Sequence, residues 1–147
     1  MDIKRDSYLQ QLISYRFDGL VKVITGIRRC GKSYLLKNIY REYLLQNGVK
    51  EDQIIVIELD LAKDIKYRNP LILSKYVREI VENSKEDFYL FVDEIQMSDE
   101  VPNPYNEEGK KITFYDALND LRSLSNLDVY VTGSNSKMLS SDILTEF

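Results

Sequence analysis

Strand-like and helix-like stretches alternate along this chain, and that alternation most constrains its fold. Four short runs are dense in Val, Ile, Tyr and Phe, as buried strands are; they are Leu20–Thr25, Gln53–Leu59, Phe88–Val92 and Asp128–Thr132. Because stretches of helical period separate these runs, we expect right-handed crossovers and a parallel sheet covered on both faces. The sequence therefore predicts an α/β fold with three layers.

Apolar residues at helical spacing predict the covering helices. One helix is expected over Ser33–Gln46 and another over Thr113–Leu124. Between them, Asn69 followed by Pro70 is typical of an N-cap and a first helical position. A weaker pattern predicts a helix before the first strand, with Asp6 as its N-cap.

One connection is longer than the rest. Residues 97–112 (MSDEVPNPYNEEGKKI) hold two of the three prolines, a glycine and several acids, which favours an exposed loop over a missed helix. Such a loop is either an insertion without chemistry or a segment that contacts a partner or covers a site.

Composition excludes several classes of protein. The 147 residues suit a single domain over 1–147, and the absence of histidine removes histidine-dependent triads and imidazole metal sites. The one cysteine, Cys30, cannot form an internal disulfide, so a reducing compartment and the cytoplasm are expected. The formal net charge of -4 makes nucleic-acid binding through this domain unlikely on electrostatic grounds. No apolar run approaches the ~20 residues that cross a bilayer, so no membrane partner is expected.

The segment GIRRCGKS follows the first predicted strand and leads into a helix. It satisfies the pattern G-x-x-x-x-G-K-[ST], in which backbone N–H groups wrap a chain of phosphates. Lys32 would place a positive charge on the β- and γ-phosphates, and the Ser33 hydroxyl would bind Mg²⁺. The residues predicted to bind the nucleotide are Gly26, Ile27, Arg28, Arg29, Cys30, Gly31, Lys32, Ser33 and Tyr34.

Two adjacent carboxylates follow the third apolar strand. Ligands bind at the carboxyl edge of a parallel sheet, so Asp93 and Glu94 are expected there. Asp93 is predicted to support the Mg²⁺ shell together with Ser33, and Glu94 to polarise the water that attacks the γ-phosphate. Lys32 and Glu94 are accordingly candidate catalytic residues.

The fourth strand ends in Thr132-Gly133-Ser134-Asn135, where Ser134 is the favoured sensor of the γ-phosphate or attacking water. The alternative is that these residues only form a turn. Arg28 and Arg29 lie at the crown of the phosphate loop and are expected to face solvent.

Three segments together, GIRRCGKS, FVDEIQ and VYVTGSNSKMLSSDI, resemble the AAA-type P-loop ATPase domain of a large bacterial and archaeal family. The resemblance covers essentially the whole chain. It implies ATP and Mg²⁺ as ligands, Asp93 and Glu94 as the Walker B pair, and TGSN as the sensor region. It also implies a sheet ordered 5-1-4-3-2 and, in members of the family, a further carboxyl-terminal domain.

The chain stops at Phe147, where such proteins usually continue into an arginine-bearing stretch and further strands. We therefore expect an amino-terminal fragment whose strand order is 1-4-3-2, with the fifth strand missing and Leu20–Thr25 left as an exposed edge that invites self-association. Without an arginine to stabilise the transition state, hydrolysis by this piece is expected to be weak or absent.

The leading hypothesis is an ATP-hydrolysing switch that binds ATP and ADP and has a protein partner. GTP binding is disfavoured because no N/T-K-x-D element is present, and a small-molecule kinase because it would leave Glu94 no water to activate. Two alternatives stay open: a module in which nucleotide binding without turnover is the signal, and a nucleic-acid-associated ATPase whose DNA-binding part lies elsewhere.

Overall fold

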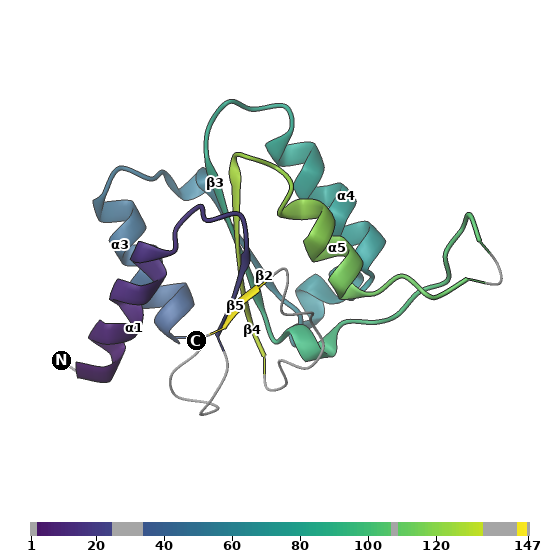
Figure 1. Ribbon diagram of the computed structural model, residues 1–147, viewed down its shortest axis with the longest axis horizontal. Helices are drawn as coiled ribbons and strands as arrows, with labels where there is room; N and C mark the ends of the chain where they lie inside the picture. Colours follow the sequence, from purple (N-terminus) through teal and green to yellow (C-terminus); the bar gives the residue numbers. More distant parts are fainter. Residues whose placement is uncertain (1–2, 25–33, 107–108, 134–143, 147) are drawn as a thin grey trace.

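The computed structural model describes residues 3–24, 34–106, 109–133 and 144–146, and shows a parallel sheet between two layers of helices (Figure 1). The strands lie in the order β2-β3-β4-β1-β5, and every neighbouring pair is parallel. Their bounds are Val21–Ile24 for β1, Ile54–Glu58 for β2, Phe88–Asp93 for β3, Leu127–Thr132 for β4 and Leu144–Glu146 for β5. The predicted α/β class and the order 1-4-3-2 are confirmed. Each predicted strand end agrees with the observed one to within one residue.

The prediction of a missing fifth strand was wrong. Strand β5 pairs with β1 from Val21↔Leu144 to Val23↔Glu146, so β1 is not the exposed edge that the sequence led us to expect. The strand has only three residues, which is too short to show the alternating pattern by which strands are recognised. The sheet has the order 5-1-4-3-2 that the family resemblance implies.

Helices cover both faces of the sheet. On one side lie α1, Ile3–Ser14, and the pair formed by η1, Leu35–Tyr40, and α3, Arg41–Gln46; on the other lie α4, Pro70–Val81, and α5, Phe114–Leu121 (Figure 1). The described residues also include 3-10 segments: η2, Glu51–Gln53, η3, Ala62–Arg68, and η4, Ile95–Met97. This is the predicted three-layer arrangement.

Local signals account for where the helices begin and end. The Asn69 side chain caps α4 by accepting hydrogen bonds from the backbone N–H groups of Leu71 (2.9 Å) and Ile72 (3.3 Å), as predicted. The N-cap of α5 is Thr113, and this helix ends at Leu121 rather than Leu124. Asp6 was the wrong N-cap for α1, since that helix begins at Ile3.

The helix predicted over Ser33–Gln46 is divided in two. Leu35–Tyr40 forms a π-helical segment, and the α-helical pattern resumes at Arg41. Apolar spacing predicts a helix over this span but does not show that its first part is wound with the wider i→i+5 hydrogen bonds. Such π segments occur often beside functional sites.

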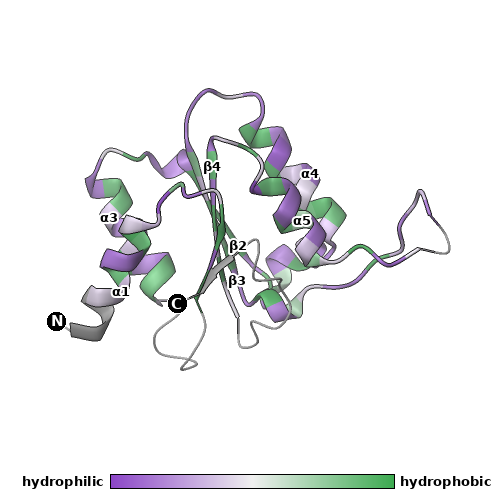
Figure 2. Cartoon of the chain, in the orientation of Figure 1, coloured by the Kyte–Doolittle hydropathy of each residue, from purple (hydrophilic) through white to green (hydrophobic). Residues whose placement is uncertain are grey.

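The sheet separates two apolar cores by the alternation of side chains along each strand. Odd and even positions divide cleanly: on β3, for example, Leu90 and Val92 pack toward α4 and α5, while Tyr89 and Phe91 pack toward α1 and α3. Figure 2 shows that α4 and α5 each carry hydrophobic and hydrophilic residues, as helices do that bury one stripe. Asp93 lies two residues beyond Phe91 on β3, Glu58 two beyond Val56 on β2, and Thr132 two beyond Tyr130 on β4, so their side chains belong to the α1 and α3 side.

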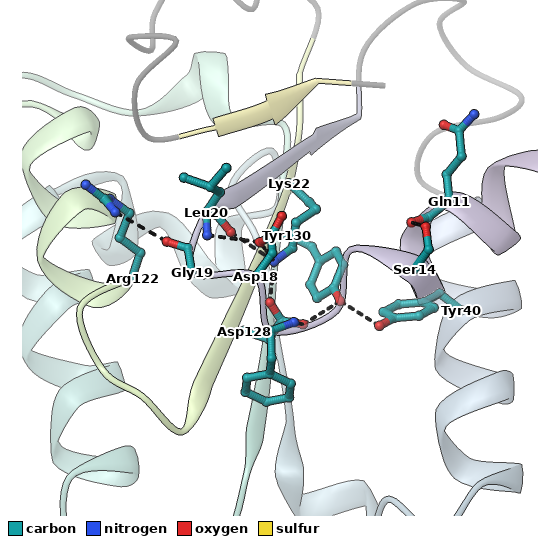
Figure 3. Close-up of polar contacts among 11 residues, drawn as sticks. Gln11, Ser14, Asp18, Gly19, Leu20, Lys22, Tyr40, Arg122, Asp128 and Tyr130 are labelled. Carbon is teal, nitrogen blue, oxygen red and sulfur yellow. Dashed lines mark hydrogen bonds and ion pairs between the residues drawn. The ribbon is translucent and has the colours of Figure 1, made fainter.

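A buried polar network lies on that same side, toward the amino ends of β1 and β4 (Figure 3). The Lys22 ammonium is fully buried; it donates to Asp128 Oδ1, to Asp18 Oδ1 (3.0 Å) and to the Leu20 carbonyl (2.9 Å). The other oxygen of Asp128 accepts from the Phe17 amide (3.0 Å) and from the Tyr130 hydroxyl (2.6 Å). Burial raises the pKa of Asp128, although Lys22, Tyr130 and the Phe17 amide oppose the effect.

The connection after η4 leaves the body of the domain as a long excursion (Figure 1). Backbone hydrogen bonds in both directions between Val101 and Ile112 (3.0 and 2.7 Å) join its two limbs, and Tyr105 beyond them is 95% exposed. The predicted exposed loop is therefore present. In the part of the chain that the structure describes, no helix is long and apolar enough to cross a bilayer.

Candidate functional site at the carboxyl edge of the sheet

Three neighbouring strands end in polar residues. Glu58 is the last residue of β2, Asp93 of β3 and Thr132 of β4. Parallel strands bring their carboxyl ends to one edge, and Glu58 and Asp93 are register partners across β2 and β3. Asp93 and Glu94, which the sequence marked as functional, therefore lie at this edge.

Asp93 is buried and held from two directions. Its Oδ1 accepts a hydrogen bond from the Thr132 hydroxyl, and its Oδ2 accepts one from the Lys37 ammonium at 2.9 Å. A buried carboxylate requires such charge-assisted partners, because desolvation alone would be costly. The donors fix the Asp93 carboxylate at the edge of the sheet.

The Lys37 ammonium is shared between two carboxylates. Besides Asp93, it donates to Glu58 Oε1 at 3.0 Å, and Glu58 Oε2 lies 3.5 Å from the Lys63 ammonium. Burial lowers the pKa of Lys37, but the hydrogen bonds to Asp93 and Glu58 outweigh that effect, and the pKa is raised overall. Lys37 is therefore a cation, and the charges alternate in sign from Lys63 through Glu58 and Lys37 to Asp93.

Glu94 adopts a left-handed backbone conformation, with φ 61° and ψ 57°. Its N–H donates to Thr132 Oγ1 at 3.0 Å, and its carboxylate accepts from the Gln96 side-chain amide. A non-glycine residue in this region costs about 1–2 kcal/mol, a strain that is common where a side chain must be aimed at a site. Thr132 thus joins both acids, since its hydroxyl donates to Asp93 and accepts from Glu94.

Gly133 lets β4 approach the turn that follows Glu94. A Cβ at this position would lie 2.7 Å from Cγ2 of Ile95 and 3.3 Å from Oε1 of Gln96. The Gly133 N–H also donates to the carbonyl of Ile24, the last residue of β1, at 3.3 Å. The ends of β1 and β4 and the turn η4 are therefore packed too closely for a side chain here.

We expect the substitution Gly133→Ala to destabilise the fold by about 1–3 kcal/mol, because the new methyl group must displace Ile95. Urea denaturation measures the loss. The substitution Ile95→Ala removes the Cγ2 atom that the new methyl group would meet. Ile95→Ala should therefore lower the free energy of unfolding by less in the Gly133→Ala background than in the unaltered chain. Strict additivity of the two changes would contradict this account of the packing.

Some of the predicted site residues lie in the described part of the chain and others do not. It places Asp93 and Glu94 at the expected edge, and Tyr34 immediately before η1, 48% exposed. Residues 26–33, with Lys32 and Ser33, lie outside the described residues, and so does Ser134. Three contributors were not singled out from the sequence: Lys37, Glu58 and Thr132.

Two of these had a signal that could have been used. Lys37 lies four residues after Ser33, a spacing that would put both side chains on one side of a regular α-helix. The alternation of side chains along the second apolar run puts Glu58 on the same face as Ile54 and Val56, at the end of the strand. The direct contact of Thr132 with Asp93 depends on rotamers that no local pattern encodes.

The side chains at this edge suit a magnesium site. Mg²⁺ is bound through one or two carboxylates and retains several waters, and Asp93 with its fixed hydroxyl neighbour supplies hard oxygen groups of that kind. Within residues 3–24, 34–106, 109–133 and 144–146, no group of three or more Asp, Glu, Cys or His side chains gathers around a common point.

Fold and edge together define a class: a parallel α/β domain of 5-1-4-3-2 strand order with an acidic pair at the carboxyl end of its third strand. The chain belongs to the AAA domain family, which matches residues 18–147. It is 34% identical over 143 residues to an uncharacterized protein of Haemophilus influenzae, covering 97% of this chain and 32% of that relative. An uncharacterized protein of Methanocaldococcus jannaschii is 31% identical over 129 residues, covering 85% and 23%. The chain thus spans a third or less of the length of these relatives.

Solved structures share the fold at low identity. A chain of Drosophila ORC bound to AT-rich DNA and Cdc6 is similar with a TM-score of 0.61 and 12% identity, covering 98% of this chain and 53% of that one. Cdc6p from Pyrobaculum aerophilum gives a TM-score of 0.57 at 14% identity, covering 97% and 45%. PCH-2 of Caenorhabditis elegans gives 0.57 at 15%, covering 95% and 39%.

Proposed function

We propose that this chain is the nucleotide-binding domain of an Mg²⁺-dependent ATPase that acts as a nucleotide-driven switch. Backbone N–H groups of residues 26–34 bind the phosphates, and Lys32 neutralises the β- and γ-phosphates. Asp93 and the Ser33 hydroxyl hold Mg²⁺, which when bound offsets charge on the phosphates.

One observation carries the proposal: Lys37, five residues after Lys32, contacts Asp93. The segment between β1 and η1 leaves Ile24, whose carbonyl is bonded to Gly133, and η1 brings Lys37 onto Asp93. Both flanks of the phosphate-binding sequence therefore lie beside the acidic edge. This arrangement supports a site in which the loop and the acids face the same ligand.

Glu94 is proposed as the group that accepts a proton from the attacking water, and Ser134 as the sensor of the γ-phosphate. A carboxylate held by Gln96 on a strained backbone is preorganised for such a role. Hydrolysis by the chain alone is proposed to be slow, because an arginine supplied by a neighbouring molecule would be needed to stabilise the charge of the transition state.

A protein partner and a cytoplasmic location complete the proposal. The single cysteine supports a reducing compartment. Some structural neighbours are complexes with DNA, yet a domain of net charge -4 has no overall positive field for phosphates. Contact with nucleic acid through this domain is therefore disfavoured.

The test is a titration of the chain with ATP, ADP and GTP in the presence of Mg²⁺. We expect saturable ATP and ADP binding, weaker GTP binding, and a loss of affinity of about tenfold or more for Lys32→Ala, since a charge-assisted phosphate contact disappears. Lys85→Ala is the matched control, because Lys85 is exposed in the turn before β3, at the opposite edge. Equal affinities for the two variants would refute the assigned site.

A further inference from the structure

The residues Lys37, Glu58 and Asp93 form an arrangement that the proposed hydrolysis does not use. A half-buried ammonium from η1 is bonded to two carboxylates at once, one from β2 at 3.0 Å and one from β3 at 2.9 Å. Only one of these carboxylates, Asp93, belongs to the Walker B pair. The other, Glu58, is 18% exposed and has a second cation, Lys63, at 3.5 Å.

We propose that Lys37 is a positioning residue that acts through Asp93: its ammonium holds this carboxylate and moves onto Glu58 when Asp93 takes up Mg²⁺. This inference rests on the proposed function and names a control of metal binding at the same site. Glu58 is the alternative partner that keeps the ammonium paired after the move.

Electrostatics supports the exchange. An ammonium directly on Asp93 repels a divalent cation bound to the same carboxylate, and at a partly buried site this repulsion is only weakly screened. The ammonium already touches both carboxylates, so a shift off Asp93 gives up one hydrogen bond but leaves the ammonium paired with Glu58. The lysine chain has several rotatable bonds, which makes such a shift accessible without movement of the backbone.

The arrangement predicts opposite effects for its two partners. Removal of the ammonium in Lys37→Met should lower the free Mg²⁺ concentration that half-saturates nucleotide binding by about three- to tenfold. Removal of the alternative carboxylate charge in Glu58→Gln should raise that concentration by a similar factor, because the ammonium then has only Asp93 as a charged partner. A purely structural role for this cluster would impair the site in both variants alike.

The experiment measures equilibrium binding of a fluorescent ATP analogue to the full chain at a series of free Mg²⁺ concentrations. Direct titration with Mn²⁺, followed by electron paramagnetic resonance, gives a second readout that does not depend on turnover. Lys37→Gln serves as a second neutral variant should Lys37→Met fail to fold. Lys50→Met is the matched control, because Lys50 also forms an ion pair, with Glu86 at 3.2 Å, but at the other edge and on the surface.

Opposite shifts in the two variants, with Lys50→Met unchanged, support the inference. Shifts in the same direction, or no shift while nucleotide binding is retained, overturn it and leave the proposed function standing. Failure of the unaltered chain to bind nucleotide at any Mg²⁺ concentration overturns the proposed function and this inference with it.

Discussion

The substitution Glu94→Gln should lower the rate of ATP hydrolysis by about a hundredfold or more while ATP still binds. Glutamine keeps the size of the side chain and its contact with Gln96, but it cannot accept a proton from water at neutral pH. The backbone N–H of residue 94 would still donate to Thr132, so the neighbouring Asp93 should keep its place. Loss of chemistry without loss of binding is therefore the expected signature.

Single-turnover hydrolysis of radiolabelled ATP measures this effect even where the basal rate is low. Glu100→Gln is the control, since it makes the same change at an exposed position in the long loop. A rate in Glu94→Gln within a fewfold of the unaltered chain would remove Glu94 from the mechanism. Should a cellular output persist in this variant, nucleotide binding alone would be the signal.

The second large effect concerns stability. Asp128→Ala should destabilise the fold by about 3–5 kcal/mol, because it takes from the buried Lys22 ammonium its closest carboxylate. It also leaves the Phe17 amide and the Tyr130 hydroxyl without their acceptor. A loss of that size is a large part of the total stability of a domain, about 5–15 kcal/mol.

Urea denaturation checks this prediction, and a double variant tests its cause. In Lys22→Met with Asp128→Asn both fully buried charges are removed, and asparagine can still accept the bonds from Phe17 and Tyr130; Asp18, which also loses Lys22, is partly exposed and keeps the Leu20 amide as a donor. The double variant should therefore be more stable than Asp128→Ala. If the double variant is the less stable of the two, the ion pair itself, rather than the penalty of an isolated charge, dominates the network.

Most of the fold follows from patterns that depend on local sequence. Runs of β-branched and aromatic residues predicted β1 to β4 because buried parallel strands must be apolar on both faces. The order of β1 to β4 was available only through the family resemblance, since strand alternation does not specify which strands are neighbours. β5 was missed because three residues give no period, and Asp6 was wrongly chosen because a good capping residue does not have to be used as one.

The sequence predicted which acidic residues lie at the site, but not which side chains contact them. Asp93 and Glu94 were found because acids after an apolar strand stand out against it. Lys37 and Glu58 were overlooked because a charge on a helix or at a strand end is ordinarily solvated, and only the meeting of two elements 21 residues apart in sequence turns them into partners. The left-handed backbone of Glu94 likewise has no signal in the residue itself, since glutamate has no preference for it.

The hydrogen bond from the Phe17 amide to Asp128 affects where the chain can be truncated without loss of stability. The AAA domain match begins at residue 18, but Leu12 of α1 is fully buried against the α3 side of the sheet. A chain that began at that boundary would expose the apolar side chains of Tyr40 and Leu44 to solvent. It would also lose the hydrogen bond from the Phe17 amide to Asp128, which connects the segment after α1 to the central strand β4. We therefore expect α1 to be part of the smallest segment of this chain that folds stably.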